Sequence, residues 1–286
     1  MKNIIITNPK KLKKIQKAIA GDGAAKLHVL ADFDRTLTYG FVNGKKIPSL
    51  ISVLRDEGYL TPDYPAAAQA LFAKYHAIET DLKIPLSQKK RAMAEWWNKH
   101  FALLIKSGLS KKDIARAVRS KNIKLRAGAV EFFKLLHAHQ IPLVIMSSSG
   151  LGGDSIALYL KRQKLLLKNV SIISNSFVWD KKGRAVGVSK PIIHGMNKDE
   201  TSIKKFPVYS KIKARKNVIL LGDSPGDVGM VTGFDFNQLI KIGFLNEDIK
   251  KNLGQYKRNF DVLILADSDF KLVNKIIKGI LAGENK

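Results

Sequence analysis

Short apolar runs recur along the chain, and each is followed by a cluster of polar turn formers. The clearest runs lie at Val29–Ala31, Leu143–Met146, Val218–Leu221 and Val262–Leu265. Apolar runs of this length between turn signals predict buried strands. Segments with helical spacing separate them, so strands alternate with helices. This alternation predicts an α/β fold with a Rossmann-like parallel sheet core and right-handed crossovers.

The spacing of apolar residues predicts the helices around this sheet. A basic amphipathic helix is expected at residues 8–20, and Gly21 and Gly23 end it. The remaining predicted elements complete the alternation: helices at 127–139, 155–163, 204–212 and 270–281, and strands at 170–173 and 176–179 with a turn at 180–183.

Between the first and second strands the pattern is helical over residues 66–122. One helix is predicted at 66–75, and a second at 88–106 with Ser87 as its N-cap. Ser110 and Asp113 have the spacing of a capping box for a third helix that ends at Arg119. We therefore expect a helical cap domain at residues 46–124, inserted into a core made of residues 1–45 and 125–286.

Two adjacent tryptophans, Trp96 and Trp97, lie on the second of these helices. Either ring could stack on a base, but an amphipathic helix buries one face, so we expect at least one of them in the core. Glu95 and Lys99 have the i, i+4 spacing of a surface ion pair.

Polar residues of particular types follow three of the predicted strands. Two acids follow the first strand, two serines the second and two acids the third, and one lysine lies between the last two strands, where the pattern predicts a helix start: Asp32, Asp34, Ser147, Ser148, Asp223, Asp227 and Lys198. Parallel strands open their carboxyl ends at one edge of a sheet, so these side chains can converge there.

This set of groups suits phosphoryl transfer. Acids from two strands can hold Mg²⁺, which prefers oxygen ligands. A serine hydroxyl, backbone amides and a lysine can hold the oxygens of a phosphate. One carboxylate can attack phosphorus to form an aspartyl phosphate, while the other moves protons. Each motif alone also fits a turn, a capping acid or a surface lysine, but their joint order favours a phosphoryl-transfer site.

The order of these motifs resembles the haloacid dehalogenase superfamily of phosphatases. The shared pattern is Asp-x-Asp-x-Thr after a strand, a later strand that ends in Ser, a Lys, and Gly-Asp-Ser-x-x-Asp. From about residue 25 to the C-terminus, five segments resemble the eukaryotic-type cytosolic pyrimidine 5'-nucleotidases: Lys74–Glu79, Glu95–Trp97, Ile193–Lys198, Ile219–Asp227 and Lys241–Asn246. The resemblance implies a haloacid dehalogenase-like core and a cap that determines substrate specificity.

The resemblance implies roles for the acids at the strand ends. Asp32 would be the nucleophile and a magnesium ligand. Asp34 would be the general acid and base, and its backbone carbonyl would face the metal. Asp223 and Asp227 would complete the magnesium site. Arg35 replaces a usually apolar residue beside the nucleophile.

Other residues would hold the phosphate and the nucleoside. By the same resemblance, Ser147 and Ser148 would bind the phosphate, and Lys198 would neutralise it and orient the nucleophile. Glu79, in the helical insert, would contact the base or the sugar. His100 stands where such enzymes usually have a serine near the nucleoside, so we expect it to contact the substrate.

The implied activity is Mg²⁺-dependent hydrolysis of nucleoside 5'-monophosphates, pyrimidine ones first, through an aspartyl phosphate. The expected partner is the nucleotide substrate. Two alternatives stay open: a phosphatase of the same superfamily that acts on another small phosphomonoester, and a basic nucleic-acid-binding protein on this scaffold.

The net charge of the chain is relevant to the second alternative, a nucleic-acid-binding protein. The chain of 286 residues has 50 Lys and Arg against 24 Asp and Glu, a formal net charge of +26. Such a charge attracts polyanions. The basic residues are scattered, however, and neither an RNA-binding signature nor zinc-finger spacing accompanies them. We therefore interpret them as a lysine-rich surface and do not expect a nucleic-acid partner.

The amino-acid composition also indicates the size of the core and the cellular compartment. With 45% hydrophobic residues the chain can build one core and a smaller second domain. The sequence contains no cysteine, which fits a reducing compartment. The apolar run at Ile4–Ile6 is too short for a signal peptide, and no stretch approaches the roughly 18 apolar residues of a membrane helix. We expect a cytoplasmic protein without a membrane partner. The oligomeric state stays open, with a monomer as the expectation.

Overall fold

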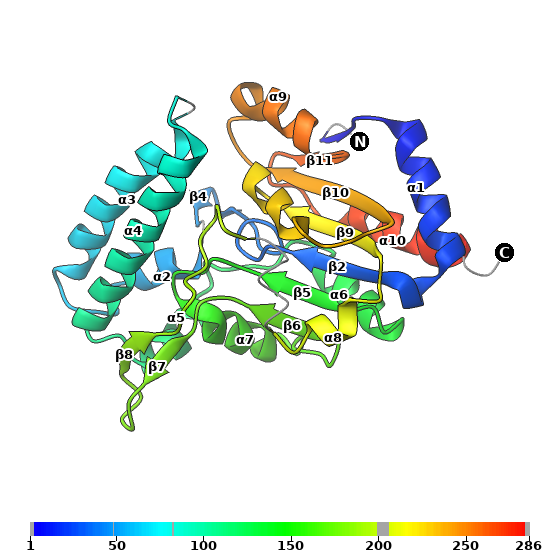
Figure 1. Cartoon of the computed structure of the whole chain (residues 1–286). Helices are drawn as coiled ribbons and strands as arrows, with labels where there is room; N and C mark the ends of the chain where they lie inside the picture. The colour runs from blue at the N-terminus through cyan, green and yellow to red at the C-terminus, as the bar shows by residue number, and fades with distance from the viewer. Residues whose placement is uncertain (1–2, 48, 82, 199–205, 284–286) are drawn as a thin grey trace.

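A seven-stranded sheet forms the centre of the protein (Figure 1). The computed structural model describes residues 3–47, 49–81, 83–198 and 206–283. The strands lie in the order β1-β11-β10-β9-β2-β5-β6, and every pairing is parallel except that of β1 with β11. Their bounds are β1 Ile4–Ile6, β2 Leu27–Ala31, β5 Leu143–Met146, β6 Val170–Ile173, β9 Asn217–Gly222, β10 Gln238–Leu245 and β11 Val262–Leu265. The predicted α/β fold with a parallel sheet is confirmed.

Helices cover both faces of this sheet because its central strands are apolar on both sides. In β2, Val29 and Ala31 pack into one apolar cluster, whereas Leu30 packs into the other. Helices of the first face are α1 Pro9–Asp22, α6 Ala129–Ala138, α7 Gly152–Arg162 and α10 Lys271–Gly283. The second face carries α8 Tyr209–Ile212, the 3-10 segment η3 Pro225–Val231 and α9 Ile249–Asn259. A short 3-10 turn, η1 Ala24–Lys26, links α1 to β2.

A helical segment between β2 and α6 lies to one side of the sheet (Figure 1). A two-stranded hairpin, β3 Phe41–Val42 and β4 Lys45–Lys46, precedes it. Four helices follow, namely α2 Leu50–Asp56, α3 Tyr64–Thr80, α4 Leu86–Lys106 and α5 Lys111–Ala117. Helices α3 and α4 lie side by side and share a small core of Tyr75, Met93 and Trp96. We call Leu50–Ala117 the helical segment below.

A second hairpin, β7 Phe177–Trp179 with β8 Ala185–Val188, joins the helical segment from a later part of the chain. The Ala185 N–H donates to the Leu109 carbonyl at 2.8 Å, and Ser110 forms a β-bridge with Arg184. The Phe177 ring packs edge-on against Phe101 of α4, with centroids 5.5 Å apart. Two stretches of sequence therefore build this side of the molecule. A strand at 176–179 and a turn at 180–183 were predicted, but their contact with the helical segment was not.

Several predicted boundaries need correction. Ser87 is not an N-cap, because α4 begins at Leu86, directly after Pro85. The insert is not wholly helical, since β3 and β4 precede α2, and the predicted domain boundary at residues 45 and 46 falls inside β4. Asn197 and Lys198 have no regular secondary structure, and because residues 199–205 lie outside the described ranges, the predicted helix start there stays a prediction. Of the helix predicted at 204–212, only Tyr209–Ile212 is helical among the described residues, and 204–205 lie outside them. The division into core and cap stays a prediction.

Among the described residues, no helix combines the length and the apolar character that a membrane span requires.

Candidate active site

The first acid of the site, Asp32, directly continues β2. Its backbone N–H donates to the Leu221 carbonyl of β9 at 3.0 Å, so the sheet ladder fixes its position. Its buried carboxylate forms an ion pair with the ammonium of Lys198, which also lies 3.0 Å from Oδ1 of Asp227. Three residues that are distant in the sequence thus meet at the carboxyl edge of the sheet, as predicted.

Asp227 reaches this point because η3 starts right after β9. Ser224 is its N-cap, and Oδ2 of Asp227 accepts hydrogen bonds from the N–H groups of Asp223 (3.1 Å) and Ser224 (2.9 Å). Gly222 allows this tight turn, since a Cβ atom on it would stand 2.5 Å from Cβ of Asp227. A side chain at position 222 would therefore displace the Asp227 carboxylate.

The carboxylates of Asp32, Asp223 and Asp227 form a group that fits a hard divalent cation. One oxygen from each lies within 4.8 Å of the others. Burial raises the pKa of Asp32 to about 7 and that of Asp223 to about 6, which reflects how poorly this site solvates negative charge. A cation would favour the ionised carboxylates, and an all-oxygen donor set suits Mg²⁺. The side chain of Asp34 is not part of this group, and the contribution of its backbone carbonyl stays a prediction.

The second acid, Asp34, is held in its neutral form. Burial and the nearby Asp32 carboxylate raise its pKa to about 8, although a hydrogen bond from the Leu50 backbone opposes the shift. Its Oδ1 atom is buried and has no hydrogen-bond partner among the described residues. At neutral pH this carboxyl can therefore donate a proton to a group that enters the site.

Lys198 stays charged in the same surroundings. Burial disfavours its ammonium, but the carboxylates of Asp227 and Asp32 outweigh burial and raise its pKa above the usual range. Its loop is fixed by Asn197, whose Oδ1 accepts from the His194 N–H at 2.6 Å and whose Nδ2 donates to the Ile192 carbonyl at 2.9 Å. The cation is thus fixed in place beside the predicted nucleophile.

The serines of the second strand end form a tight turn beside β2. Ser147 is buried, and its Oγ accepts from the Ser149 N–H at 3.1 Å, which leaves its hydroxyl hydrogen for another acceptor. Ser148 is only partly buried, and its carbonyl accepts from Nε1 of Trp97 at 3.2 Å. The structure thus brings both serines to the edge that carries Asp32.

The two residues expected to contact the nucleoside lie where the helical segment meets these loops. Nε2 of His100 donates to the Gly150 carbonyl at 3.2 Å, and burial lowers the pKa of His100 to about 4, so the ring is neutral. Glu79, near the end of α3, is partly exposed, and its Oε1 lies 3.6 Å from where a Cβ atom on Gly195 would stand. His100 thus uses one nitrogen for the loop, whereas the Glu79 carboxylate borders the loop that carries Lys198.

Asn175, just after β6, was missed by the sequence analysis. Its buried Nδ2 donates to the carbonyls of Ser149 (3.4 Å) and Ile193 (2.9 Å), and its Oδ1 accepts from the Ile193 N–H at 2.8 Å. One amide thus connects the serine turn to the loop that leads to Lys198. An isolated Asn in a turn carries no sequence signal for such a role.

Arg126 was also missed. It is 1% exposed, and it donates to the carbonyls of Thr36 (2.8 Å), Ser268 (2.6 Å) and Arg35 (2.6 Å). It also forms an ion pair with Asp267 at 2.9 Å. This side chain therefore fixes the loop that follows the two acids. Among so many basic residues, nothing in the sequence marked it as buried.

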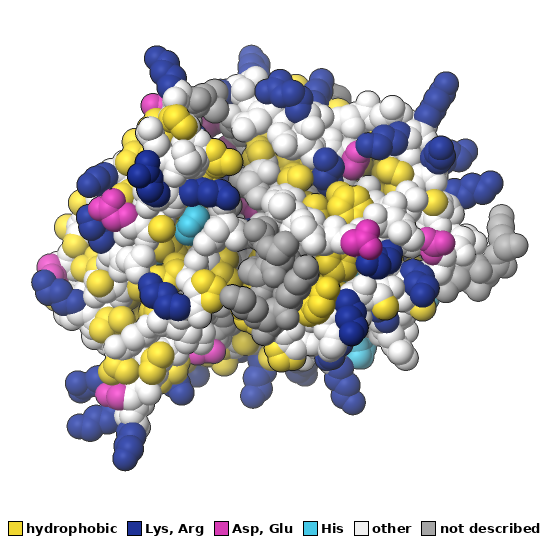
Figure 2. All heavy atoms as spheres, in the orientation of Figure 1, with side chains coloured by type: hydrophobic (Ala, Val, Ile, Leu, Met, Phe, Trp, Pro, Cys, Tyr) yellow, Lys and Arg dark blue, Asp and Glu magenta, His cyan; other side chains and the backbone are white. Residues whose placement is uncertain are grey.

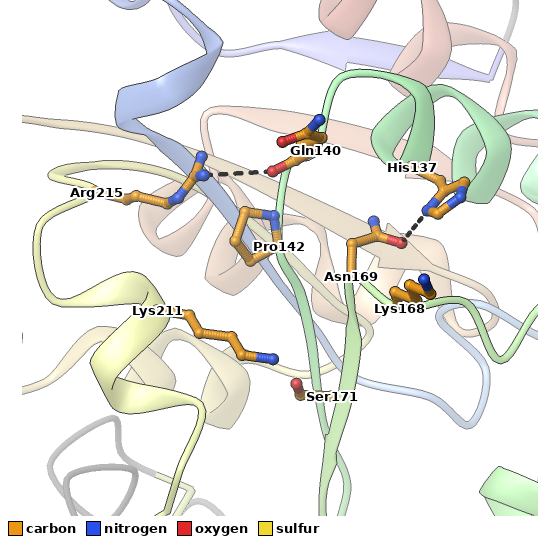
Figure 3. Close-up of a pocket in the computed structure, with 8 residues that line it drawn as sticks. All are labelled: His137, Gln140, Pro142, Lys168, Asn169, Ser171, Lys211 and Arg215. Carbon is orange, nitrogen blue, oxygen red and sulfur yellow. Dashed lines mark hydrogen bonds between the residues drawn. The ribbon is translucent and has the colours of Figure 1, made fainter.

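A hollow of about 530 Å³ lies at the opposite edge of the sheet, near the amino ends of β5 and β6 (Figure 3). The guanidinium of Arg215 is occupied there by the carbonyls of Ala24, Leu27 and Gln140. Lys168 and Lys211 also line it. This hollow contains none of the acids described above, so it is separate from the candidate active site.

The fold and the site together define a phosphatase of the haloacid dehalogenase type. A solved structure of substrate-bound phosphoserine phosphatase shares the fold, with a TM-score of 0.54 and 20% identity over 87% of this chain and 97% of that chain. The chain belongs to the pyrimidine 5'-nucleotidase (UMPH-1) family, whose family model matches residues 35–281.

Relatives across almost the whole length agree with this assignment. The 7-methylguanosine phosphate-specific 5'-nucleotidase of Gallus gallus is 31% identical over 277 residues, which cover 96% of this chain and 95% of that protein. The crystal structure of cytosolic 5'-nucleotidase IIIB bound to cytidine has a TM-score of 0.87 and 25% identity, and it covers 100% of this chain and 96% of that chain. The protein is therefore a 5'-nucleotidase of haloacid dehalogenase type, a phosphoric monoester hydrolase.

Proposed function

We propose that this protein hydrolyses pyrimidine nucleoside 5'-monophosphates in a Mg²⁺-dependent reaction with an aspartyl-phosphate intermediate. The observation that carries the proposal is the pairing of two different acids at the end of β2. Asp32 is held beside the ammonium of Lys198, whereas Asp34 has a raised pKa and an unpartnered oxygen. Two carboxyl groups with different environments can divide the roles of nucleophile and proton donor.

In the first step, a carboxylate oxygen of Asp32 forms a bond to phosphorus as the bond from phosphorus to the ribose O5' breaks. Asp34 gives its proton to O5', so the nucleoside leaves as a neutral alcohol. Lys198 and the donors of the serine turn hold the phosphate oxygens, on which negative charge is concentrated. Asp34 is then an ionised carboxylate, ready for the second step.

In the second step, Asp34 takes a proton from a water molecule. The water oxygen bonds to phosphorus, the bond from phosphorus to Asp32 breaks, and inorganic phosphate leaves. Asp32 returns to its carboxylate form and Asp34 to its acid form, so both residues are restored. Lys198 remains between Asp32 and Asp227 and keeps the nucleophile oriented.

Asp32, Asp223 and Asp227 are the side chains that would hold Mg²⁺. Bound there, the ion would supply positive charge against the phosphate and against the repulsion among the three carboxylates. The fit is supported by the all-oxygen donor set and by the raised pKa values of Asp32 and Asp223.

We propose that the helical segment is a cap that reads the nucleoside. Trp97 and His100 of α4 are hydrogen-bonded to the serine turn, so the helical segment is tied to the phosphate site at a fixed distance. Trp96 belongs to the small core of α3 and α4, which leaves Trp97 nearer the substrate. The cap would also exclude water from the first step.

Glu79 gives this cap a preference for certain bases. A carboxylate only accepts hydrogen bonds, so it can pair with the amino group of cytosine but not with the O4 atom of uracil. We therefore expect cytidine monophosphate to be hydrolysed faster than uridine monophosphate.

A second candidate substrate is 7-methylguanosine 5'-monophosphate, the compound for which the relative from Gallus gallus is named. Its base carries a positive charge and N–H donors on one edge. Glu79 could accept from those donors, and the ring of Trp97 could stack on the cationic base.

The test is a substrate panel with and without EDTA. It includes cytidine, uridine, adenosine and 7-methylguanosine monophosphates, with phosphoserine and a sugar phosphate as other monoesters. Phosphate release from the nucleotides should require Mg²⁺ and should disappear in Asp32→Asn. Asp235→Asn, the same change at an exposed surface acid, should keep full rate. Unmodified protein that releases no phosphate with Mg²⁺, or an Asp32→Asn variant with full rate, would refute the proposal.

The location and assembly are also proposals. The solved relative, cytosolic 5'-nucleotidase IIIB, is named as a cytosolic enzyme, and we propose the same cytoplasmic location and a monomeric state for this protein.

A further inference from the structure

Arg35 is a second cationic side chain, besides Lys198, at the candidate metal site. Its Nε atom lies 3.2 Å from Oδ2 of Asp223, and its Nη2 lies 2.9 Å from Oε1 of Glu247. The side chains of Arg35, Asp223 and Glu247 are 25%, 17% and 28% exposed, so water screens these contacts only in part. One guanidinium thus bridges a carboxylate of the proposed magnesium site and one outside it.

The backbone of Arg35 cannot follow its side chain if that side chain moves. The residue has a φ of 59°, in the left-handed region that is uncommon for residues other than glycine. Its carbonyl accepts from Arg126 at 2.6 Å and from Asn246 at 3.0 Å, and its N–H donates to Thr38 at 3.0 Å. Only the side chain is therefore free to exchange partners.

The Asp223 carboxylate cannot pair closely with the Arg35 guanidinium and bind a divalent cation at the same time. Each ligand of Mg²⁺ must approach closely in near-octahedral geometry, and a second cation beside the same carboxylate repels the ion. Glu247 can keep the Arg35 guanidinium paired when the contact with Asp223 is lost, because its Oε1 already pairs with Nη2 of Arg35. Lys46 also pairs with Glu247, with its Nζ atom 2.7 Å from Oε1.

We propose that Arg35 competes with Mg²⁺ for Asp223 and that Glu247 draws the arginine away when the metal binds. This inference rests on the proposed magnesium site and adds a determinant of its affinity. Arg35 is then a positioning residue rather than a catalytic one. The pair of Arg35 and Glu247 would then determine the Mg²⁺ concentration at which the site is half occupied.

The experiment measures Mg²⁺ binding alone, without nucleotide, by isothermal titration calorimetry at fixed ionic strength. Arg35→Gln removes the competing charge and should tighten Mg²⁺ binding on the order of fivefold, the effect of one half-buried charge contact. Glu247→Gln leaves the arginine on Asp223 and should weaken binding by a similar factor. Lys271→Gln, which removes one positive charge from an exposed side chain that pairs with Asp269 rather than with a site acid, should change little.

The double variant separates competition from a general field effect. If Glu247 acts through Arg35, then Glu247→Gln has no further effect once Arg35→Gln is present. Equal weakening in both backgrounds would mean that Glu247 attracts the metal directly, and this would overturn the inference. Unchanged or weaker binding in Arg35→Gln would overturn it as well.

Failure of the proposed function would look different. If neither the unmodified protein nor any variant binds Mg²⁺, the magnesium site itself is wrong, and the inference falls with it. If the unmodified protein binds Mg²⁺ and the variants match it, only the inference falls. Binding that appears only after Arg35→Gln would support a strong form of the competition.

Discussion

Asp34 is a carboxylic acid that the fold keeps neutral at a pH where an exposed aspartate is ionised. Burial and the nearby Asp32 carboxylate favour its neutral form, and they outweigh Lys198, the hydrogen bond from the Leu50 backbone and Arg35, which favour the ionised form. In the folded protein its pKa is about 8, whereas in the unfolded chain it loses its proton near the ordinary aspartate pKa of about 3.9. The folded state therefore binds more protons between these values, and stability must fall as the pH rises through this window.

Replacing Asp34 by Asn should remove both the chemistry and this loss of stability. Phosphate release should fall on the order of 10²- to 10⁴-fold, because the proton donor is gone. Relative to the unmodified protein, the free energy of unfolding of Asp34→Asn should rise between pH 5.5 and pH 8.5 by about 3 kcal/mol. Urea unfolding in EDTA at the two pH values measures this change. A constant difference between the proteins would mean that Asp34 does not titrate in this range.

Among individual residues, the sequence predicts the acids of the site well and predicts poorly the residues that position them. Asp32, Asp34, Asp223 and Asp227 follow apolar strands, where a cluster of charge has no structural purpose, and the structure does bring them together. Arg126, by contrast, is one of 50 basic residues. Its role depends on burial among backbone carbonyls, and only the folded chain reveals that burial. The same holds for Asn175.

At the scale of elements, the site depends on how neighbouring strand ends are joined. Strands β9, β2 and β5 are adjacent, so their loops meet without long side chains having to reach across the sheet. Next to them, Asn175 after β6 joins the serine turn to the loop that carries Lys198. These two loops bind the same phosphate in the proposed mechanism, so a change in their spacing should weaken that binding.

The variant Asn175→Ala should raise the inhibition constant for inorganic phosphate by about tenfold, because a misplaced loop weakens each phosphate contact. A matched control lies at the other end of β6, where Asn169 donates from Nδ2 to the Ile141 carbonyl at 2.8 Å. Its Oδ1 also accepts from Nδ1 of His137 at 3.1 Å. Asn169→Ala should therefore lower stability by about 1 to 2 kcal/mol, the typical effect of two lost hydrogen bonds, without changing phosphate inhibition. Equal inhibition constants for phosphate in the two variants would show that Asn175 does not position the phosphate-binding loops.

The elements themselves were predicted where local signals agree with the fold. The capping box of Ser110 and Asp113 forms with both hydrogen bonds, and strands β5 and β11 have the predicted bounds. Ser87 failed as a cap because the chain enters the helix directly after Pro85, whose own conformation is extended.

Strand β10 was not predicted from the sequence, because it contains Gly243 and glycine in the interior of a strand is unfavourable. That glycine is required in the structure, since a Cβ atom there would stand 2.6 Å from the ring of Phe260. A close contact between two segments thus accounts for a residue that local propensity disfavours.

At the scale of the whole molecule, the net charge of +26 is spread over the surface. Figure 2 shows Lys and Arg side chains scattered over the visible face among apolar and neutral side chains, rather than gathered in one stripe. Such a distribution suits the interpretation of a lysine-rich surface better than a nucleic-acid groove, which needs a continuous basic path. Because positive charges outnumber negative ones by 26, the charges on the folded protein repel one another on balance.

Screening this repulsion should stabilise the protein. Raising NaCl from about 0.02 M to about 0.3 M shortens the Debye length from roughly 20 Å to roughly 6 Å and should increase the free energy of unfolding by about 1 kcal/mol. Urea midpoints at each salt concentration measure the effect, and KCl should give the same slope. A midpoint that falls with added salt would show that attractive ion pairs, rather than repulsion, dominate the surface.

The antiparallel strand β1 has a consequence for how this protein behaves at high concentration. It is only three residues long, Ile4–Ile6, yet it covers the outer edge of β11, whose sequence Val262–Leu265 is wholly apolar. A lysine-rich helix follows at once, so the exposed rim next to β1 is short and flanked by charge. Without β1, an apolar strand with unpaired backbone groups would be available to another molecule.

Deleting residues 1–7 should therefore cause intermolecular strand pairing and aggregation, although no catalytic group is lost. Ile5→Val, which keeps a β-branched residue in the strand, is the control and should remain dispersed. Light scattering during storage at high concentration measures the difference, and a truncated protein whose particle size stays constant would contradict the expectation. Three residues at the sheet edge, far from the acids, would then determine whether the enzyme stays in solution.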